Sequence, residues 1–290
     1  MKTKIEYLDY TWNPLAMRCT HVSPGCEHCW HLRMATRLAA NFNLPARHRT
    51  AWAGGGGLVG PVAMREKELL APLHWRKPRR VGVQFMGDLF HESVGAKWFD
   101  VFNIMARAKR HTFLVLTKRA ERMAGLVNDA FALAADPGPL PNVWLGVTVE
   151  NADYVHRLDD LMATPAAVRF VSIEPMLGPV DLSPWLGPSL VCDGCGKEIS
   201  GAPVGYPHSE VWNAGDPAEF CGRVIERPML DWVIVGGETG PGARPMHPDW
   251  VRDVRDQCVA AGVPFFFKQM SGKAPIPPDL LIREFPRCER

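Results

Sequence analysis

The chain has 290 residues, of which 47% are hydrophobic and 22% charged, and its formal net charge is +2. This composition is that of an ordinary globular protein with a sizeable core, and the charge is too small to indicate a nucleic-acid binder by itself. The N-terminus lacks an apolar signal core and no stretch approaches the roughly 18 apolar residues of a membrane span, so we expect a cytoplasmic protein that is not bound to a membrane.

Seven apolar runs predict β-strands, in chain order. The first is short and covers residues 5 to 11, and the others cover residues 80 to 86, 112 to 116, 142 to 149, 168 to 173, 231 to 237 and 263 to 268. Near-continuous apolar strands separated by helices are typical of a parallel sheet buried on both faces. Helical spacing predicts helices near residues 96 to 109, 119 to 134, 152 to 163 and 248 to 261. This alternation predicts an α/β protein, with one partial or open β/α barrel over residues 1 to 290.

Polar residues follow nearly every predicted strand. In barrels and in doubly wound sheets, chemistry takes place at the carboxyl ends of the strands. The residues at these ends are Gly87, Asp88, Thr117, Lys118, Arg119, Thr148, Glu150, Glu174, Gly237, Glu238, Lys268 and Gln269. For any single position, there is an equal alternative to a functional role: the charged residue simply begins where the strand leaves the core. Taken together, these residues would meet at the carboxyl edge of the sheet, which favours a functional site there.

One segment, residues 187 to 228, interrupts the repeat and is interpreted as an insertion within the barrel. It is rich in Gly, Pro and polar residues and contains Cys192, Cys195, His208 and Cys221. The C-x2-C pair is typical of the start of a zinc knuckle, and zinc would hold together an insertion too polar to form its own core. Unliganded thiols and an auxiliary iron–sulfur cluster are the two alternatives.

Three further cysteines, Cys19, Cys26 and Cys29, lie within eleven residues in a C-x6-C-x2-C pattern. In a cytoplasmic protein such a group favours metal binding or catalysis over disulfides. A structural zinc site would need a fourth ligand, for which the neighbouring histidines are candidates: His21, His28 and His31. An iron–sulfur cube held by three thiolates would instead leave one iron open.

Several linked motifs carry a resemblance to a known family. They are "TWNPLAMRCTHVSPGCEHCW", "FMGDLFHESV", "HTFLVLTKRAERM", "LPNVWLGVTVE", "VRFVSIEPMLGPVDL", "WVIVGGETGPGARPMHPDWVRDVRDQC" and "AGVPFFFKQM". Together they resemble a phage and prophage protein family related to radical SAM enzymes, over nearly the whole chain outside residues 187 to 228. Most radical SAM enzymes have C-x3-C-x2-C, so this cysteine loop is longer. A longer loop can still present three sulfurs, because closure entropy changes slowly with length.

The resemblance implies a partial TIM-like β/α barrel of the radical SAM type. It implies a 4Fe-4S cluster on Cys19, Cys26 and Cys29, with S-adenosylmethionine on the open iron. Reductive cleavage would yield methionine and a 5′-deoxyadenosyl radical, with electrons from a partner such as flavodoxin or ferredoxin. A phage-encoded protein would work in the cytoplasm of the host cell.

The resemblance also implies roles for the strand ends. Gly87 and Asp88 resemble the place where radical SAM enzymes bind the methionine amino group. The other candidates for cofactor contacts are Thr117, Lys118, Glu150, Ser172, Glu174, Gly236 and Gly237. Glu238 and Lys268 are the candidate catalytic residues beside the substrate. The glycines could instead shape a tight strand exit, and Lys268 could extend to solvent.

These observations favour a radical SAM enzyme of isomerase or lyase type that acts on DNA or a modified nucleotide. Rearrangement of an amino-acid-decorated thymidine during phage DNA hypermodification is the leading interpretation, and repair of a thymine photoproduct is the enzymatic alternative. A hypothesis from another class is a non-catalytic DNA-binding protein in which zinc holds both cysteine groups. Two basic runs, residues 74 to 80 and 107 to 111, could contact phosphate or simply be solvated.

Overall fold

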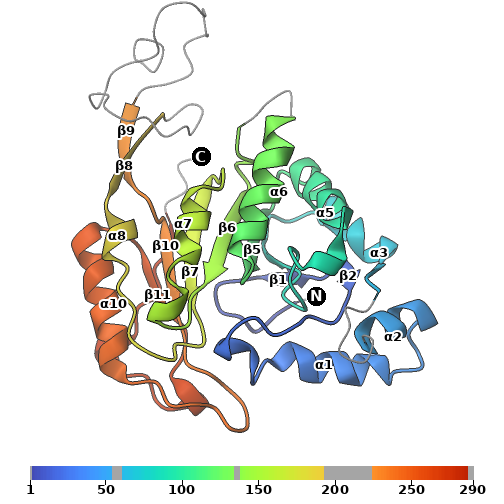
Figure 1. The fold of residues 1–290 in the computed structure, drawn as a ribbon, viewed down its shortest axis with the longest axis horizontal. Coiled ribbons are helices and arrows are strands. Elements are labelled where there is room, and N and C mark those ends of the chain that lie inside the picture. Colours follow the sequence, from blue (N-terminus) through green and yellow to red (C-terminus); the bar gives the residue numbers. More distant parts are fainter. Residues whose placement is uncertain (1, 54–60, 134–137, 193–223, 287–290) are drawn as a thin grey trace, which may run out of the picture.

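The structure is a computed structural model and describes residues 2–53, 61–133, 138–192 and 224–286. Its centre is a seven-stranded sheet in the order β1-β4-β5-β6-β7-β10-β11, in which every neighbouring pair is parallel. The strands are β1 (Tyr10–Trp12), β4 (Arg80–Val83), β5 (Thr112–Thr117), β6 (Val143–Thr148), β7 (Val168–Ile173), β10 (Trp232–Val235) and β11 (Phe265–Phe267). The sheet curls into a half barrel with helices around it (Figure 1). The predicted partial β/α barrel is confirmed at this level.

The helices and short strands fall between these seven strands. The α-helices are α1 (Trp30–Ala39), α2 (Ala46–Ala53), α3 (Glu66–Leu69), α4 (Ala71–His74), α5 (Lys97–Arg107), α6 (Ala120–Ala132), α7 (Arg157–Met162), α8 (Ser183–Leu186) and α10 (Pro248–Ala261). The remaining elements are β2 (Leu15–Ala16), β3 (Ala63–Met64), β8 (Pro188–Cys192), β9 (Val224–Pro228), η1 (Pro24–Cys26), η2 (Glu92–Val94), η3 (Ala152–Tyr154), η4 (Ser271–Lys273) and η5 (Pro278–Leu280).

Helix α10 shows how local sequence sets its ends. It begins with Pro248, and the His247 side chain accepts a hydrogen bond from the Asp249 backbone N–H. Gly262 ends it in the left-handed region, with φ of 68°. Proline suits a first helical turn and glycine suits this final conformation, so both predicted ends are confirmed.

Two predicted elements differ from the structure. The first strand was predicted at residues 5 to 11, but β1 begins at Tyr10, because Tyr7 and Leu8 turn beneath the half barrel and pack in its inner core. The helix predicted at residues 152 to 163 is divided into η3 and α7. The Asn151 side chain caps η3 by accepting from the Asp153 N–H.

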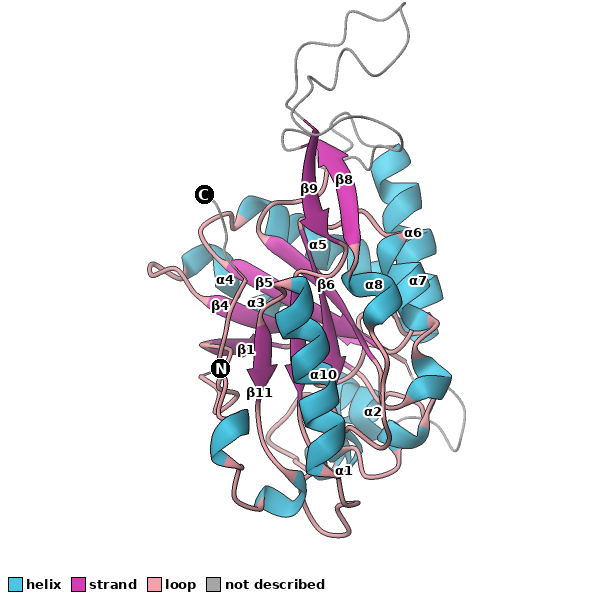
Figure 2. Cartoon of the chain, turned by 90° about the vertical axis from the view of Figure 1, so that its left-hand side faces the viewer, coloured by secondary structure: helices cyan, strands magenta, loops and turns pink. Residues whose placement is uncertain are grey.

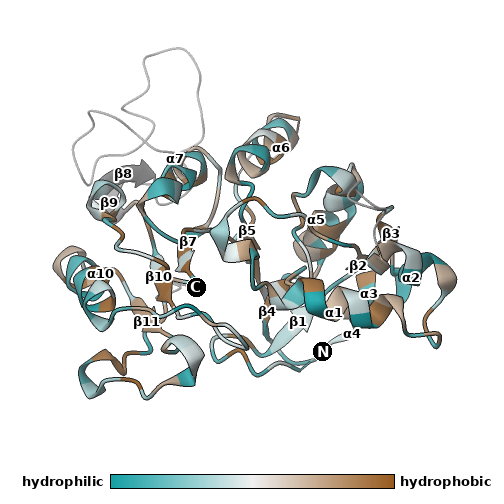
Figure 3. Ribbon diagram, turned by 60° about the horizontal axis from the view of Figure 1, so that its bottom comes forward, coloured by the Kyte–Doolittle hydropathy of each residue, from teal (hydrophilic) through white to brown (hydrophobic). Residues whose placement is uncertain are grey.

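The sheet has a different core on each face. Side chains such as Val143, Leu145 and Val147 pack with the helices in the larger core. The alternate residues point into the half barrel, where Trp144 belongs to a second cluster of mainly aromatic side chains. That cluster also contains Leu114, Phe170, Trp232, Ile234 and Phe266. Figure 3 shows the strands largely in hydrophobic colours and the surrounding helices in mixed colours.

The inner face becomes polar toward the carboxyl ends of the strands. Because side chains alternate along a strand, residues two, four or six positions beyond the aromatic layer also point inward. These residues are Lys118, Thr148, Glu150, Ser172, Glu174, Gly236 and Lys268. The half barrel therefore has an apolar floor with a polar and partly charged layer above it. This layer consists of residues that the sequence placed at the strand ends.

Strands β8 and β9 form a separate antiparallel pair, from Pro188 opposite Pro228 to Cys192 opposite Val224. This pair begins and ends the predicted insertion. Since β9 ends four residues before β10 begins, the pair adjoins the amino end of β10. Figure 2 shows it projecting at the end of the molecule opposite to the carboxyl ends of the strands. Among the described residues, no helix has the length and apolar character needed to cross a membrane.

Candidate functional site

The cysteine loop, residues 19 to 29, lies across the carboxyl ends of the sheet. Within it, η1 is followed by a turn in which the Cys29 N–H donates to the Cys26 carbonyl over 3.2 Å. The structure describes four cysteine side chains, and all of them are free thiols: Cys19, Cys26, Cys29 and Cys258. The loop is attached at three places, each involving a charged residue at or just after a strand end.

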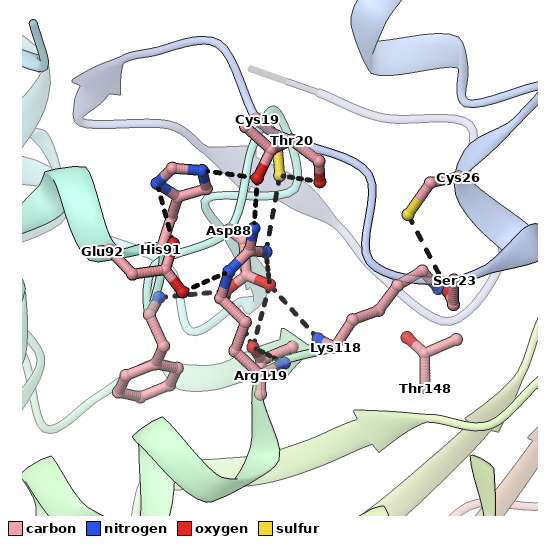
Figure 4. Close-up of polar contacts among 12 residues, drawn as sticks. Cys19, Thr20, Ser23, Cys26, Asp88, His91, Glu92, Lys118, Arg119 and Thr148 are labelled. Atoms are coloured by element: carbon pink, nitrogen blue, oxygen red, sulfur yellow. Dashed lines mark hydrogen bonds and ion pairs between the residues drawn. The ribbon is translucent and has the colours of Figure 1, made fainter. Parts of the chain in front are cut away.

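The first attachment is Arg119, which follows β5 and is 8% exposed (Figure 4). Its Nη1 lies 3.7 Å from Cys19 Sγ and 3.2 Å from Asp88 Oδ2, and its Nη2 donates to Thr20 Oγ1 over 2.8 Å. Its Nε donates to Glu92 Oε1 over 3.3 Å. One guanidinium thus links the cysteine loop to the segment that follows β4.

Asp88 holds Arg119 in place. Its carboxylate accepts hydrogen bonds from Thr117 Oγ1 over 2.8 and 2.9 Å, from the Lys118 N–H over 3.2 Å and from the Phe90 N–H over 3.0 Å. The residue is 5% exposed. The Asp88 carboxylate is thus surrounded by protein donors and by Arg119. Its direct role in this structure is to position Arg119.

The Cys19 thiol is strongly affected by its surroundings. Burial raises the pKa of this thiol to about 12, and the Asp88 carboxylate adds to the increase while Arg119 opposes it. The Cys19 N–H also donates to Nε2 of the buried His31 over 3.3 Å. Burial lowers the pKa of His31 to about 4, so this ring is neutral at physiological pH. Cys19 is therefore a protonated thiol in the protein by itself.

His91 supports the same end of the loop. It is fully buried, and its Nε2 lies 3.0 Å from Thr20 Oγ1 while its Nδ1 accepts from the Ser93 N–H. Burial is the main cause that lowers the pKa of His91. Neither His91 nor Thr20 was singled out from the sequence. The signal was present, because His91 belongs to the "FMGDLFHESV" motif.

The second attachment is Glu150, after β6, which is fully buried. It pairs with Lys118 Nζ and with Arg157 Nη1, both at 2.9 Å, and accepts a 2.5 Å hydrogen bond from Ser23 in the loop. A side chain at Gly25 would meet Glu150 Oε1 at 2.6 Å, so a glycine is needed where the loop crosses this carboxylate. Ser23 is a further residue that the sequence interpretation missed.

The third attachment is Glu238, after β10. Its carboxylate binds Arg244 through contacts of 2.6 and 2.9 Å, and its Oε2 lies 2.9 Å from His28 Nδ1. Arg244 also donates to the Pro24 carbonyl and pairs with Glu27, so it clamps the middle of the loop. Burial opposes ionisation of Glu238, but the hydrogen bonds from Arg244 and His28 lower its pKa to about 2.

A separate polar group lies between β7 and β11. Glu174 accepts from Lys268 Nζ over 2.6 Å and from Gln269 Nε2 over 2.9 Å. The side chains of Lys268 and Glu174 are 18% and 22% exposed, so both are partly open to a ligand. Gly236 faces Glu174, because a side chain there would lie 3.2 Å from the Glu174 Cδ. The structure thus joins four of the predicted site residues.

Two predicted glycines are explained by close packing. Gly87 has φ of 133°, and a side chain there would meet Met17 at 2.7 Å. A side chain at Gly237 would clash with the backbone of Ser271, while its N–H donates to the Gln269 carbonyl. Ser172 is buried on the inner face of β7, where its carbonyl accepts a hydrogen bond from the Val149 N–H over 3.0 Å.

In the described part of the chain, no group of three or more His, Cys, Asp or Glu side chains stands in an arrangement that could hold a metal ion. Cys19 points toward Arg119, and Cys26 Sγ lies 3.9 Å from Ser23 Oγ. In the second cysteine group, Cys192 ends β8, and Cys195, His208 and Cys221 lie outside the described residues.

The fold and this site define a class of protein, an α/β half barrel of parallel strands with a three-cysteine loop held across its carboxyl edge. Residues 2–277 match a family described as "Protein of unknown function (DUF5131)", and the chain belongs to that family. No curated protein and no solved structure was found to match the chain.

Proposed function

We propose that this protein is a radical SAM enzyme that modifies or rearranges a nucleic-acid base. The observation that carries the proposal is the attachment of one three-cysteine loop to three strand ends of a parallel half barrel. Arg119, Glu150 and Glu238 make these attachments through buried or largely buried charged contacts. This is the edge where β/α barrels carry their chemistry.

The donor set fits a 4Fe-4S cluster in type and in location. Cys19, Cys26 and Cys29 supply three soft sulfur ligands, and a three-thiolate set leaves one iron free for S-adenosylmethionine. Their present side-chain directions do not gather the sulfurs, so ligation requires Cys19 to turn from Arg119 and Cys26 from Ser23. When bound, the cluster would supply the electron for reductive cleavage of S-adenosylmethionine, received from a flavodoxin or ferredoxin.

The chain's own residues would bind and orient the reactants. Lys118 and Arg157 pair with Glu150 beneath the loop, and Asp88 keeps Arg119 directed at it. The partly exposed Lys268 and Glu174 face the interior of the half barrel, where they would hold polar groups of the cofactor or substrate. A closed apolar floor beneath them would keep water from the reacting atoms.

The substrate we propose is a base in DNA or a modified nucleotide, with an amino-acid-decorated thymidine of phage DNA as the leading candidate. For the second cysteine group, we propose a structural zinc site on Cys192, Cys195, His208 and Cys221. The resemblance to phage and radical SAM proteins supports the first proposal, and the C-x2-C spacing supports the second.

Oxygen-free reconstitution with iron and sulfide tests the cluster. We expect about four irons at the first site, a paramagnetic signal after dithionite, and 5′-deoxyadenosine when S-adenosylmethionine is added. Cys26→Ala should lose the iron, the signal and the product. Cys258→Ala, which removes a buried thiol in α10, should retain all three. Zinc alone at both groups, with no iron uptake, would support the non-catalytic DNA-binding alternative and refute the enzyme.

The substrate is tested by incubating reconstituted enzyme with modified and unmodified DNA, followed by digestion and mass spectrometry of the nucleosides. A changed nucleoside, with transfer of isotope label from the substrate into 5′-deoxyadenosine, is the expected result. DNA containing a thymine photoproduct, used as a parallel substrate, separates repair from hypermodification. Cleavage of S-adenosylmethionine with no altered nucleoside in any DNA would exclude the nucleic-acid substrate.

A further inference from the structure

Helices α1 and α2 carry an unusual charge pattern. Between Glu27 and Glu66 the sequence has no Asp, Glu or Lys, and its cations of fixed charge are all arginine. These are Arg33, Arg37, Arg47, Arg49 and Arg65. The stretch is thus strongly positive within a chain whose net charge is only +2. The net charge of the whole chain conceals this local excess of positive charge.

Two of these arginines face solvent without a counter-charge. Arg33 and Arg37 are exposed on α1, and neither pairs with a carboxylate in the described part of the chain. The others are engaged: Arg47 pairs with Glu66 at 2.7 Å, Arg65 donates to the Asn13 carbonyl, and Arg49 lies over an aromatic ring. Arg33 and Arg37 therefore remain available to an anion.

Exposed aromatic rings accompany these arginines. Phe42, in the α1–α2 connection, is 82% exposed, and the Arg49 guanidinium lies 4.5 Å from its ring centroid. Trp30, the first residue of α1, is 49% exposed. Exposed rings beside arginine are the means by which proteins stack unpaired bases while binding the phosphates between them. Arginine suits this better than lysine, since its planar group both stacks and binds phosphate through two bonds.

The apolar side of α1 is already covered. Ala35 and His31 are buried, and Ala35 packs with Ala51 and Trp52 of α2 in a small core of its own. What α1 and α2 leave outside is polar and positive, with isolated rings. This arrangement does not offer the continuous apolar stripe that insertion into a lipid surface needs.

The surface borders the candidate site. Trp30 directly follows Cys29, and the Arg33 guanidinium lies so close to Gly240, after β10, that a side chain on that glycine would meet it at 2.9 Å. Figure 1 shows α1 and α2 on the side of the molecule toward which the strands point. A chain lying along α1 would therefore lead to the opening of the half barrel.

We propose that the outer face of α1 and α2 binds a polynucleotide with unpaired bases. Arg33 and Arg37 contact its phosphates, and Trp30 and Phe42 stack its bases. The inference deepens the proposed function, on which it rests for the chemistry, by making the substrate a polymer rather than a free nucleotide. It also gives the enzyme a way to hold the strand on each side of the base that enters the half barrel.

Fluorescence anisotropy with a labelled single-stranded oligonucleotide tests this surface. Arg33→Ala/Arg37→Ala should weaken binding by about tenfold or more, and it should lower the slope of log K against log salt by about 1.4, from two lost phosphate contacts at roughly 0.7 each. Phe42→Ala should weaken binding by about five- to a hundredfold. The matched control, Arg107→Ala/Lys109→Ala, removes the same charge from exposed residues before β5, at the opposite edge, and should bind normally.

Three results would overturn the inference. One is equal weakening in both double variants, which would mean a general charge effect. Another is free thymidine monophosphate competing as well as the oligonucleotide. The third is binding to phosphatidylserine vesicles, but not to the oligonucleotide, that depends on Arg33 and Arg37.

The binding assay needs no turnover, so it tests this surface separately from the proposed enzyme activity. Oligonucleotide binding by a protein that takes up no iron would keep this inference and refute the proposed enzyme, whereas iron uptake without binding would do the reverse.

Discussion

At the scale of single residues, Arg119 joins the cysteine loop to the segment that follows β4. It contacts Cys19 and Thr20 in the loop, and Asp88 and Glu92 after β4. Such a buried charge is stable only while its partners remain, because each partner repays part of the loss of hydration. Nearby carboxylates and the Cys19 sulfur raise the pKa of Arg119 despite its burial. The loop and the β4–β5 edge therefore depend on each other.

Replacing Arg119 tests this dependence. Arg119→Met keeps most of the side-chain volume but leaves Asp88 without its cation, so we expect the free energy of unfolding to fall by about 3 kcal/mol or more. Urea denaturation measures the change. Arg252→Met is the control, since its partner Asp279 is largely exposed and the loss should be small. Equal losses of unfolding free energy in the two variants would show that the buried Arg119 contacts stabilise the fold no more than an exposed ion pair does.

Glu238 gives the site a defined dependence on pH. Its pKa of about 2, against an ordinary 4.5, means that its ionised form stabilises the folded protein above pH 4.5 and loses this effect as pH falls toward 2. Glu238→Gln should therefore be less stable than the parent protein at pH 7. The difference between the two should shrink between pH 4.5 and 2, as followed by urea denaturation at each pH. A difference that stays constant over this range would contradict the assigned contacts.

At the scale of elements, Gly146 shows how the half barrel is packed. It lies in β6 on the inner face, and a side chain there would meet the Phe170 ring at 2.5 Å. Gly125, in α6, has nothing within 4 Å of the position that a side chain would take. Gly146→Ala should destabilise the protein by about 1–3 kcal/mol through overpacking. Gly125→Ala should stabilise it by about 0.5–1 kcal/mol. Thermal unfolding of both variants measures the two changes in stability. If both substitutions stabilise the protein, residue 146 does not pack against the Phe170 ring as described.

Local patterns were sufficient for six of the seven strands of the sheet and for α5, α6 and α10, but not for the site. The run at residues 142 to 149 and the capping residues of α10 act through neighbours in sequence, so β6 and α10 were predicted well. Arg119 and Cys19 are 100 residues apart, and Lys268 and Glu174 are 94 apart. Strand ends indicated that such residues share a rim, while the choice of partners depends on packing in three dimensions. The first strand was misplaced for the same reason, because Tyr7 packs against the distant Trp232.

At the scale of the whole molecule, the carboxyl and amino edges of the sheet carry different groups of residues. The carboxyl edge holds the cysteine loop, the polar and charged strand ends and the positive face of α1 and α2. The amino edge holds the β8–β9 pair and the basic runs at residues 74 to 80 and 107 to 111, which precede β4 and β5. These runs therefore lie away from the candidate site, and a substrate at the carboxyl edge would not contact them.

This division predicts that the segment between β8 and β9 can be removed without loss of the cluster. Replacing residues 193–223 by Asn-Gly would join Cys192 to Val224, which already face each other, through a turn that suits a two-residue hairpin. We expect the reconstituted variant to retain the iron content and unfolding midpoint of the parent, because neither β8 nor β9 pairs with the seven-stranded sheet. Zinc content should fall to background if the second cysteine group binds zinc as proposed. Iron lost together with the segment would instead show that the two cysteine groups form one centre, and the separation of the two edges would then be wrong.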